Sequence, residues 1–211
     1  MNSLVEMKSF VRDLNLNLLT NNAEIEIDPS KRYCDRFRWF MPNRKLIASI
    51  IKSGGILTGS RALRCYKVNG EYILDRRTKD WDFVVTQDIA FKICAQYDIN
   101  IIPGIDKVIS VKNQRRYVHP AYSDAYRVGP VDVQMIIKDE LPDYQMVKEI
   151  RFSSLSYVLN EKVKMIDELY TLISNSNYSS ISDARKELDK HLDDMTRTII
   201  KFNNASYNAR Q

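Results

Sequence analysis

Apolar residues recur at helical spacing in some segments of the chain and form short continuous runs in others. After Asn43, Leu46, Ile47, Ile50 and Ile51 share one face, which predicts a helix capped by Asn43 and ended by Gly54-Gly55. A weaker helical pattern lies within residues 1–20, and Asp88 is the expected cap of a helix that ends near Tyr97. Short apolar runs predict strands at residues 56–58, 83–85, 107–112, 115–119 and 131–137.

The last third of the chain is predicted to form two antiparallel helices. One apolar stripe runs from about Leu155 to Ile173, a polar linker spans residues 174–182, and a second stripe starts near Asp183. The expected class is α+β, with a sheet domain and a C-terminal helical hairpin. The expected segments are 1–42 (helix and basic-aromatic segment), 43–150 (sheet domain), 151–202 (helical hairpin) and 203–211 (polar tail).

Composition narrows the class of protein and of partner. The 211 residues fit one domain with a helical appendage, and 44% hydrophobic content is enough for a core. The net charge of +5 favours phosphate-bearing partners, nucleic acid among them. Cys34, Cys65 and Cys94 form no CxxC pair, so we expect no zinc site and a reducing, cytoplasmic location. No apolar run is long enough for a membrane span, so no membrane partner is expected.

A basic and aromatic segment, Lys31 to Lys45, has two interpretations. Interleaved Arg and aromatic side chains can stack bases and bind phosphates. Alternatively, Phe37, Trp39 and Phe40 anchor the segment to the core while the arginines stay solvated. Farther along, Asn69-Gly70 predicts a tight hairpin between Tyr66 and Leu74.

Residues 54–86 hold the chemistry on which the functional hypothesis rests. Gly59-Ser60 follows a predicted strand, and a helix beginning at Arg61 would offer backbone N–H groups to an anion. Asp80 and Asp82 share one face of the next strand, because side chains alternate along it. Asp132, on another predicted strand, can join them. Three carboxylates are suited to Mg²⁺, which prefers hard oxygen ligands.

This order of elements resembles the polymerase-beta-type nucleotidyltransferase superfamily over about residues 43–137. The resemblance implies a small mixed sheet flanked by helices and transfer of a nucleoside monophosphate from an NTP, such as ATP, to a hydroxyl. It implies two Mg²⁺ ions, with Mn²⁺ as the alternative. Gly59 and Ser60 would hold the triphosphate, Asp80 and Asp82 would bind both metals, and Asp132 would bind the catalytic metal and help deprotonate the acceptor. Arg61 and Lys79, which flank these residues, are further nucleotide-binding candidates.

A second, shorter match lies in the C-terminal helices. The segment from Tyr157 to Lys164 is similar to the helical tail of small family members, where a lysine often reaches the triphosphate. Lys162 and Lys164 are therefore candidates, and a solvated helix face is the equally weighted alternative. The hairpin at residues 66–74 is an insertion relative to compact members, and it is a candidate gate or acceptor-binding element.

Two non-catalytic functions remain open from the sequence. The fold can serve as a catalytically silent scaffold, or as a nucleic-acid-binding component of a larger assembly. If that assembly is viral, the expected location is the virion or the host cytoplasm. The acceptor, which could be RNA, protein or a small molecule, is not specified by any motif in the chain.

Overall fold

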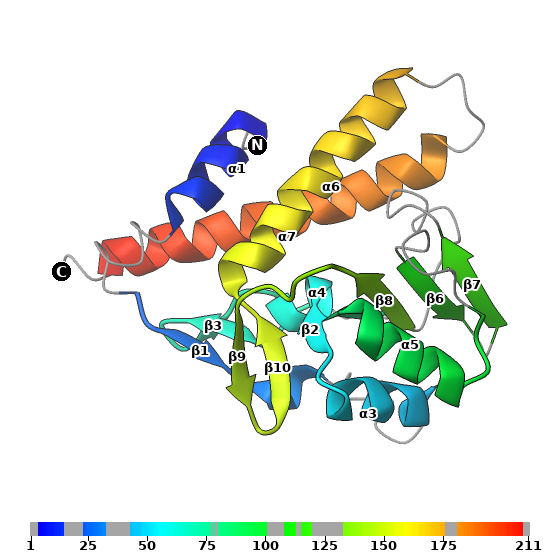
Figure 1. Ribbon diagram of the computed structural model, residues 1–211. Coiled ribbons are helices and arrows are strands. Elements are labelled where there is room, and N and C mark those ends of the chain that lie inside the picture. Colours follow the sequence, from blue (N-terminus) through cyan, green and yellow to red (C-terminus); the bar gives the residue numbers. More distant parts are fainter. Residues whose placement is uncertain are drawn as a thin grey trace. The chain divides into compact units, whose positions relative to one another are not determined.

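The computed structural model describes residues 4–14, 23–32, 43–76, 78, 80–100, 108–112, 115–119, 133–175 and 181–208. The chain divides into two compact units. The sheet unit contains residues 29–62 and 77–154, and the helical unit contains residues 1–28, 63–76 and 155–211. Both units combine helices with strands (Figure 1), so the expected α+β class is confirmed.

The sheet unit is built on a seven-stranded mixed sheet of order β7-β6-β8-β5-β2-β10-β9. Strand β5 is antiparallel to β2 and parallel to β8, and β2 is parallel to β10. The remaining neighbours are antiparallel. The strands are β2 (Ile56–Thr58), β5 (Trp81–Val85), β6 (Val108–Lys112), β7 (Arg115–His119), β8 (Val133–Ile137), β9 (Tyr144–Val147) and β10 (Ile150–Ser153).

The central strands β2, β5 and β8 are almost wholly buried, which explains their continuous apolar sequence. The unit's other elements are η1 (Pro29–Arg32), α3 (Arg44–Lys52), α4 (Gly59–Leu63, which ends in the helical unit) and α5 (Gln87–Gln96). Helices α3 and α5 lie side by side (Figure 1), and the hydroxyls of Ser49 and Tyr97 are 3.1 Å apart between them.

Both predicted helix caps need correction. Asn43 does occupy the N-cap of α3, but its φ is 62° and its side chain makes no capping hydrogen bond. The N-cap of α5 is Thr86, whose hydroxyl accepts from the Ile89 N–H at 3.5 Å, and Asp88 lies in the first turn instead. An acidic residue there still favours the helix, because it complements the N-terminal dipole.

The helical unit contains segments from both the N-terminal and the C-terminal part of the chain. Its elements are α1 (Leu4–Arg12), β1 (Ile25–Ile27), β3 (Tyr66–Val68), β4 (Glu71–Tyr72), α6 (Leu155–Asn175) and α7 (Ile181–Asn208). Helix α6 packs on both α7 and α1. Phe10 of α1 meets Phe202 of α7 edge-on, with ring centroids 5.5 Å apart. The predicted helical pair is therefore confirmed, and the N-terminal helix packs with it.

The Asn69-Gly70 hairpin is confirmed. Both residues have positive φ, 50° and 79°, and Val68 pairs with Glu71 across them. Strand β3 also pairs with β1, which makes a three-stranded sheet. The sequence predicts this hairpin within the 43–150 domain, whereas the structure groups residues 63–76 with the terminal helices. The grouping depends on contacts between segments that are far apart in sequence.

Much of the basic-aromatic segment, residues 33–42, lies outside the described residues. Neither interpretation of the segment is therefore decided. Among the helices that are described, none has the length and apolar character needed to cross a bilayer.

A buried ion cluster anchors the helical unit. Asp194 of α7 is fully buried and accepts from Lys162 Nζ at 2.6 Å and from Arg76 Nε and Nη2 at 2.6 and 2.7 Å. Burial alone would raise the pKa of Asp194, but the positive charges of Lys162 and Arg76 outweigh it and hold that pKa well below its ordinary value. Burial lowers the pKa of the adjacent His191, with Lys162 adding to the effect, so this imidazole is neutral.

Asp194→Asn should lower the free energy of unfolding by about 3–5 kcal/mol, because it leaves the buried Lys162 ammonium without a compensating charge. Asp193→Asn is the matched control, since Asp193 is 45% exposed and pairs with Arg197 four residues later on the same helix. That variant should cost less than about 1 kcal/mol. Chemical denaturation measures both values, and equal costs would contradict the role given to the cluster.

The Asp194 cluster also predicts a pH dependence. A carboxyl with a lowered pKa in the folded state stabilises the protein above its unfolded-state pKa of about 3.9, and this stability is lost as pH falls further. The difference in unfolding free energy between wild type and Asp194→Asn should thus be constant near neutral pH and shrink below about pH 4. Denaturation curves between neutral and acidic pH measure it, and a difference that grows on acidification would refute the assignment.

Candidate acidic site beside the Gly-Ser turn

The two ends of the predicted motif meet at the carboxyl end of β2. Thr58 pairs with Asp82 of β5, and Gly59 follows with φ of 66°. A Cβ built on Gly59 would lie 3.0 Å from the Asp82 Cγ and closer still to its Oδ2. The carboxylate of Asp82 therefore rests directly on the Gly59 Cα, with Ser60 as the next residue in the chain. Only glycine satisfies both the positive φ and this approach.

Buried aromatic side chains alternate with acidic side chains at the start of β5. The rings of Trp81 and Phe83 stack with centroids 6.0 Å apart, and both side chains are buried. Asp82 lies between them in sequence and is half-buried. Asp80, two residues earlier, is also half-buried, with its Oδ1 atom shielded from solvent. The alternation of side chains along a strand supports the expectation that Asp80 and Asp82 share a face.

Arg61, a predicted nucleotide-binding residue, is 4% exposed and holds the acidic segment in place. Its guanidinium donates from Nε to the Asp80 carbonyl at 2.7 Å and from Nη2 to the Thr78 carbonyl at 2.9 Å. Nη1 donates to the Arg32 carbonyl, and the Cζ lies 4.4 Å above the Trp81 ring. Three backbone carbonyls and a ring face thus compensate this buried charge. No sequence pattern indicates this positioning role, because its acceptors are backbone atoms.

Two further predicted residues, Lys79 and Asp132, lie outside the described residues. Strand β8 begins at Val133, the residue after Asp132, and Val133 pairs in parallel with Trp81. β8 is thus the immediate neighbour of the strand that contains Asp82 and directly follows Asp80. Within the described ranges, no group of three or more His, Cys, Asp or Glu side chains is arranged to bind a metal.

The two predicted lysines of α6 have different environments. Lys162 is 4% exposed and belongs to the Asp194 cluster, so the alternative of a solvated helix face is wrong for this residue. Lys164 is on the exposed face, with its Nζ 2.7 Å from Glu161 Oε1. The sequence pattern failed to separate them because the partner of Lys162 is 32 residues away in the next helix.

Comparison of the chain with protein-family models matched no family, and comparisons with curated proteins and with solved structures also found no match. The function of the chain is therefore inferred from the geometry of the described residues and from the resemblance of the motif.

The carboxylates near the paired ends of β2 and β5 bring negative charge and oxygen ligands to one end of these central strands. Helix α4, which begins with Gly59 and Ser60, has only five residues, so its dipole adds little attraction for an anion. A phosphate at the turn would instead depend on Ser60, on backbone N–H groups and on a cation that offsets the carboxylates. The site is thus better suited to a phosphate accompanied by metal ions than to a bare phosphate.

Gly59→Ala should destabilise the protein by more than about 2 kcal/mol, because it adds a collision with Asp82 to the strain of a positive φ. Gly70→Ala is the control, since its φ is 79° but an added Cβ meets no atom within 4 Å. That variant should cost about 1–2 kcal/mol from backbone strain alone. Urea denaturation measures both.

A second substitution separates the collision from the strain. Asp82→Ala in the Gly59→Ala background should lower the cost of the added methyl group towards that of Gly70→Ala. If the cost of Gly59→Ala is the same with and without the Asp82 carboxylate, the contact between these two residues is not the cause.

Proposed function

We propose that this chain is a metal-dependent nucleotidyltransferase of the polymerase-beta type, with Asp80, Asp82 and Asp132 as metal ligands. It would transfer a nucleoside monophosphate from an NTP to an acceptor hydroxyl. The observation that carries the proposal is the Asp82 carboxylate resting on Gly59. Residues that are 23 positions apart in sequence meet there, which puts one proposed metal ligand beside the Gly59-Ser60 segment.

The residues fit Mg²⁺, or Mn²⁺ as the alternative, by the chemistry of their donors. Asp80 and Asp82 are carboxylates at alternate positions, and hard divalent ions prefer oxygen ligands. If the two side chains share a face, as alternation along an extended segment predicts, their like charges would also favour a bound cation. When bound, such ions stabilise the attacking and leaving oxygens of phosphoryl transfer.

The other residues would have separate roles. Ser60 follows the turn and would donate its hydroxyl to a triphosphate oxygen, while Gly59 allows close approach of the backbone. Asp132 precedes β8, the strand beside β5, and would complete the ligand set. Lys79, in the same unit, stays a candidate cation for the triphosphate. Arg61 would act indirectly, because its guanidinium holds the Asp80 backbone.

Asp82→Asn and Asp80→Asn should each reduce nucleotide transfer by at least about 100-fold, because a neutral amide removes charge that the metal requires. Asp132→Asn should have a similar effect. The measurement is incubation with labelled NTPs, Mg²⁺ or Mn²⁺, and a mixed pool of RNA, protein and small-molecule acceptors. Asp88→Asn is the matched control: Asp88 is exposed on α5, and its loss should leave transfer within about twofold.

Binding distinguishes the enzyme from a silent scaffold. A folded protein that binds an NTP with Mg²⁺ must be stabilised by it, so its unfolding temperature should rise with ligand, and less so for Asp82→Asn. Full transfer activity in Asp82→Asn would overturn the metal assignment. Absence of both transfer and NTP-dependent stabilisation would favour the scaffold.

A further inference from the structure

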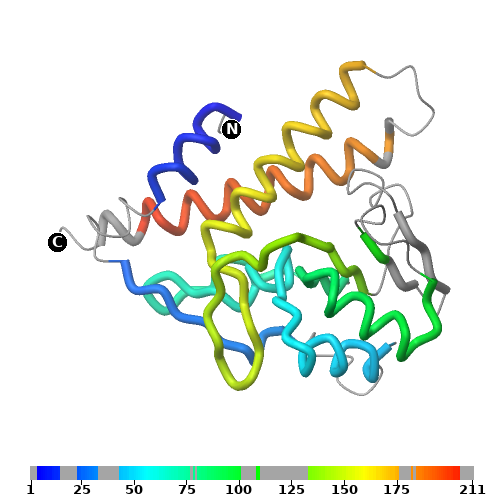
Figure 2. The backbone as a smooth tube through the Cα atoms, viewed as in Figure 1, coloured from blue at the N-terminus to red at the C-terminus, as the bar shows by residue number. Residues whose placement is uncertain are grey.

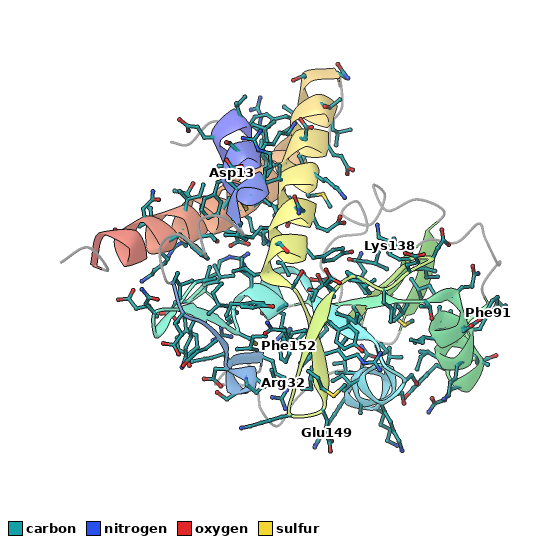
Figure 3. All side chains as sticks on the ribbon, turned by 60° about the vertical axis from the view of Figure 1, so that its left-hand side comes forward. Asp13, Arg32, Phe91, Lys138, Glu149 and Phe152 are labelled. Carbon is teal, nitrogen blue, oxygen red and sulfur yellow. The ribbon has the colours of Figure 1, made fainter. Side chains whose placement is uncertain are left out.

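The seven-stranded sheet ends in an exposed strand, β9. In the described part of the chain, β10 is its only strand neighbour. Tyr144 and Met146 are 43% and 60% exposed, and the intervening Gln145 is exposed as well. The β9–β10 hairpin is the narrow yellow-green loop in Figure 2. Glu149 is at its turn, and Phe152, on the returning strand, is buried (Figure 3).

The hydrogen-bond pattern shows which backbone groups face away from β10. Ser154 N donates to Asp143 O at 2.8 Å, so residue 143 directs its carbonyl towards the β10 side. In an antiparallel pair this orientation alternates along the strand, so residue 145 shares it and residues 144 and 146 have the opposite one. The N–H and C=O groups of Tyr144 and Met146 therefore point to the free edge.

This edge lacks the features that usually prevent strands from pairing. The sequence of β9, Tyr-Gln-Met-Val, contains no charge and no proline. Natural edge strands are commonly protected by lysine, proline or a bulge. The end of β9 is a tight turn in which Lys148 and Glu149 both have positive φ, so the strand stays regular up to that turn.

The flanks of β9 carry opposite charges. Before the strand, residues 138–143 contain one Lys against two Asp and one Glu. After it, residues 148–151 contain Lys148 and Arg151 against Glu149. Antiparallel pairing of two such strands places the acidic flank of each beside the basic flank of the other, whereas parallel pairing would place like charges together.

We propose that β9 pairs antiparallel with β9 of a second copy of this chain, joining the two sheets in a symmetric dimer. Tyr144 lies opposite the partner's Met146, and Met146 lies opposite the partner's Tyr144. These are the residues whose backbone groups face the free edge, so each pair exchanges both hydrogen bonds. Their side chains add a sulfur–aromatic contact. Gln145 then lies opposite the partner's Gln145 on the two-fold axis.

A groove beside β9 provides room for the partner's turn. It has a volume of about 520 Å³ and is lined by Leu141, Pro142, Asp143, Tyr144, Gln145 and Ser154. In this register the partner's Lys148 lies opposite Pro142, at the groove. Shifting the register by two residues in one direction would set Asp143 against the partner's Glu149, and in the other it would pair Met146 with the partner's Pro142, which has no N–H to donate.

Sedimentation equilibrium of the full chain over a range of concentrations tests the dimer. The contact is short, so we expect a reversible monomer–dimer equilibrium. Met146→Pro removes an N–H that faces the free edge and no bond to β10, and it should weaken dimerisation about 10-fold or more. Met146→Leu keeps the N–H and should leave the dimer within a few-fold. Circular dichroism of both variants checks that the fold is unchanged.

Cysteine cross-linking tests the register. Gln145→Cys places two thiols on the two-fold axis, with Cα atoms about 4.5 Å apart, which suits a disulfide. Met146→Cys places them more than about 7 Å apart, so it should not cross-link. Wild type controls for the native cysteines, of which Cys65 and Cys94 are buried.

Three results would overturn the proposal. One is a monomer at all concentrations with no Gln145→Cys cross-link. Another is cross-linking at Met146→Cys in place of Gln145→Cys, which would reject this register. The third is a monomer that binds an unrelated extended peptide at β9, which would assign the edge to another partner.

Discussion

The contact between the Asp82 carboxylate and the Gly59 Cα is the constraint on which the sheet unit's acidic edge depends. It fixes the end of β2 against β5, since Thr58 pairs with Asp82 immediately before the turn. It also forbids any side chain at position 59. Because the turn and the acidic pair are held together by strand pairing, the site is part of the buried sheet and does not depend on a separate loop.

Buried cations in this chain are compensated in two different ways. Arg61 directs its guanidinium at backbone carbonyls, including those of Asp80 and Thr78, and thereby fixes the segment that leads into β5. Lys162 instead meets a buried carboxylate, Asp194, which also binds Arg76. A planar guanidinium has several N–H donors and can bind carbonyls that lie in different directions. A compact ammonium is better matched to a single anion. Arg61 and Lys162 were both predicted to bind the nucleotide. In the structure, Arg61 is buried in the sheet unit and Lys162 is buried in the helical unit.

The proposed metal site and the proposed dimer contact lie on different strands of the sheet. Its middle strands, β2 and β5, are buried and carry the Gly-Ser turn and the acidic pair. Its β9 edge is neutral and exposed, and its backbone groups are directed outward. A dimer through β9 would not involve β2 or β5 in the new strand pairing, because β10 lies between β9 and β2 in the sheet. Substitutions at the proposed metal ligands and at β9 therefore test the two proposals independently.

The sequence by itself determined the local structure. Apolar periodicity predicted α3, α5, α6 and α7, apolar runs predicted the central strands, and Asn69-Gly70 predicted its hairpin, because these signals act within a few residues. The sequence did not show that Asn43 lacks a capping bond or that Thr86 is the cap of α5, since several nearby side chains can serve as a cap.

Only the tertiary structure decided what the long-range partners are. The role of Arg61 depends on carbonyls up to 29 residues away, and that of Lys162 on a carboxylate in the next helix. The grouping of residues 63–76 with the terminal helices also joins distant segments. Residue type and spacing specify neither backbone acceptors nor contacts between remote segments, because these arise only when packing brings the segments together.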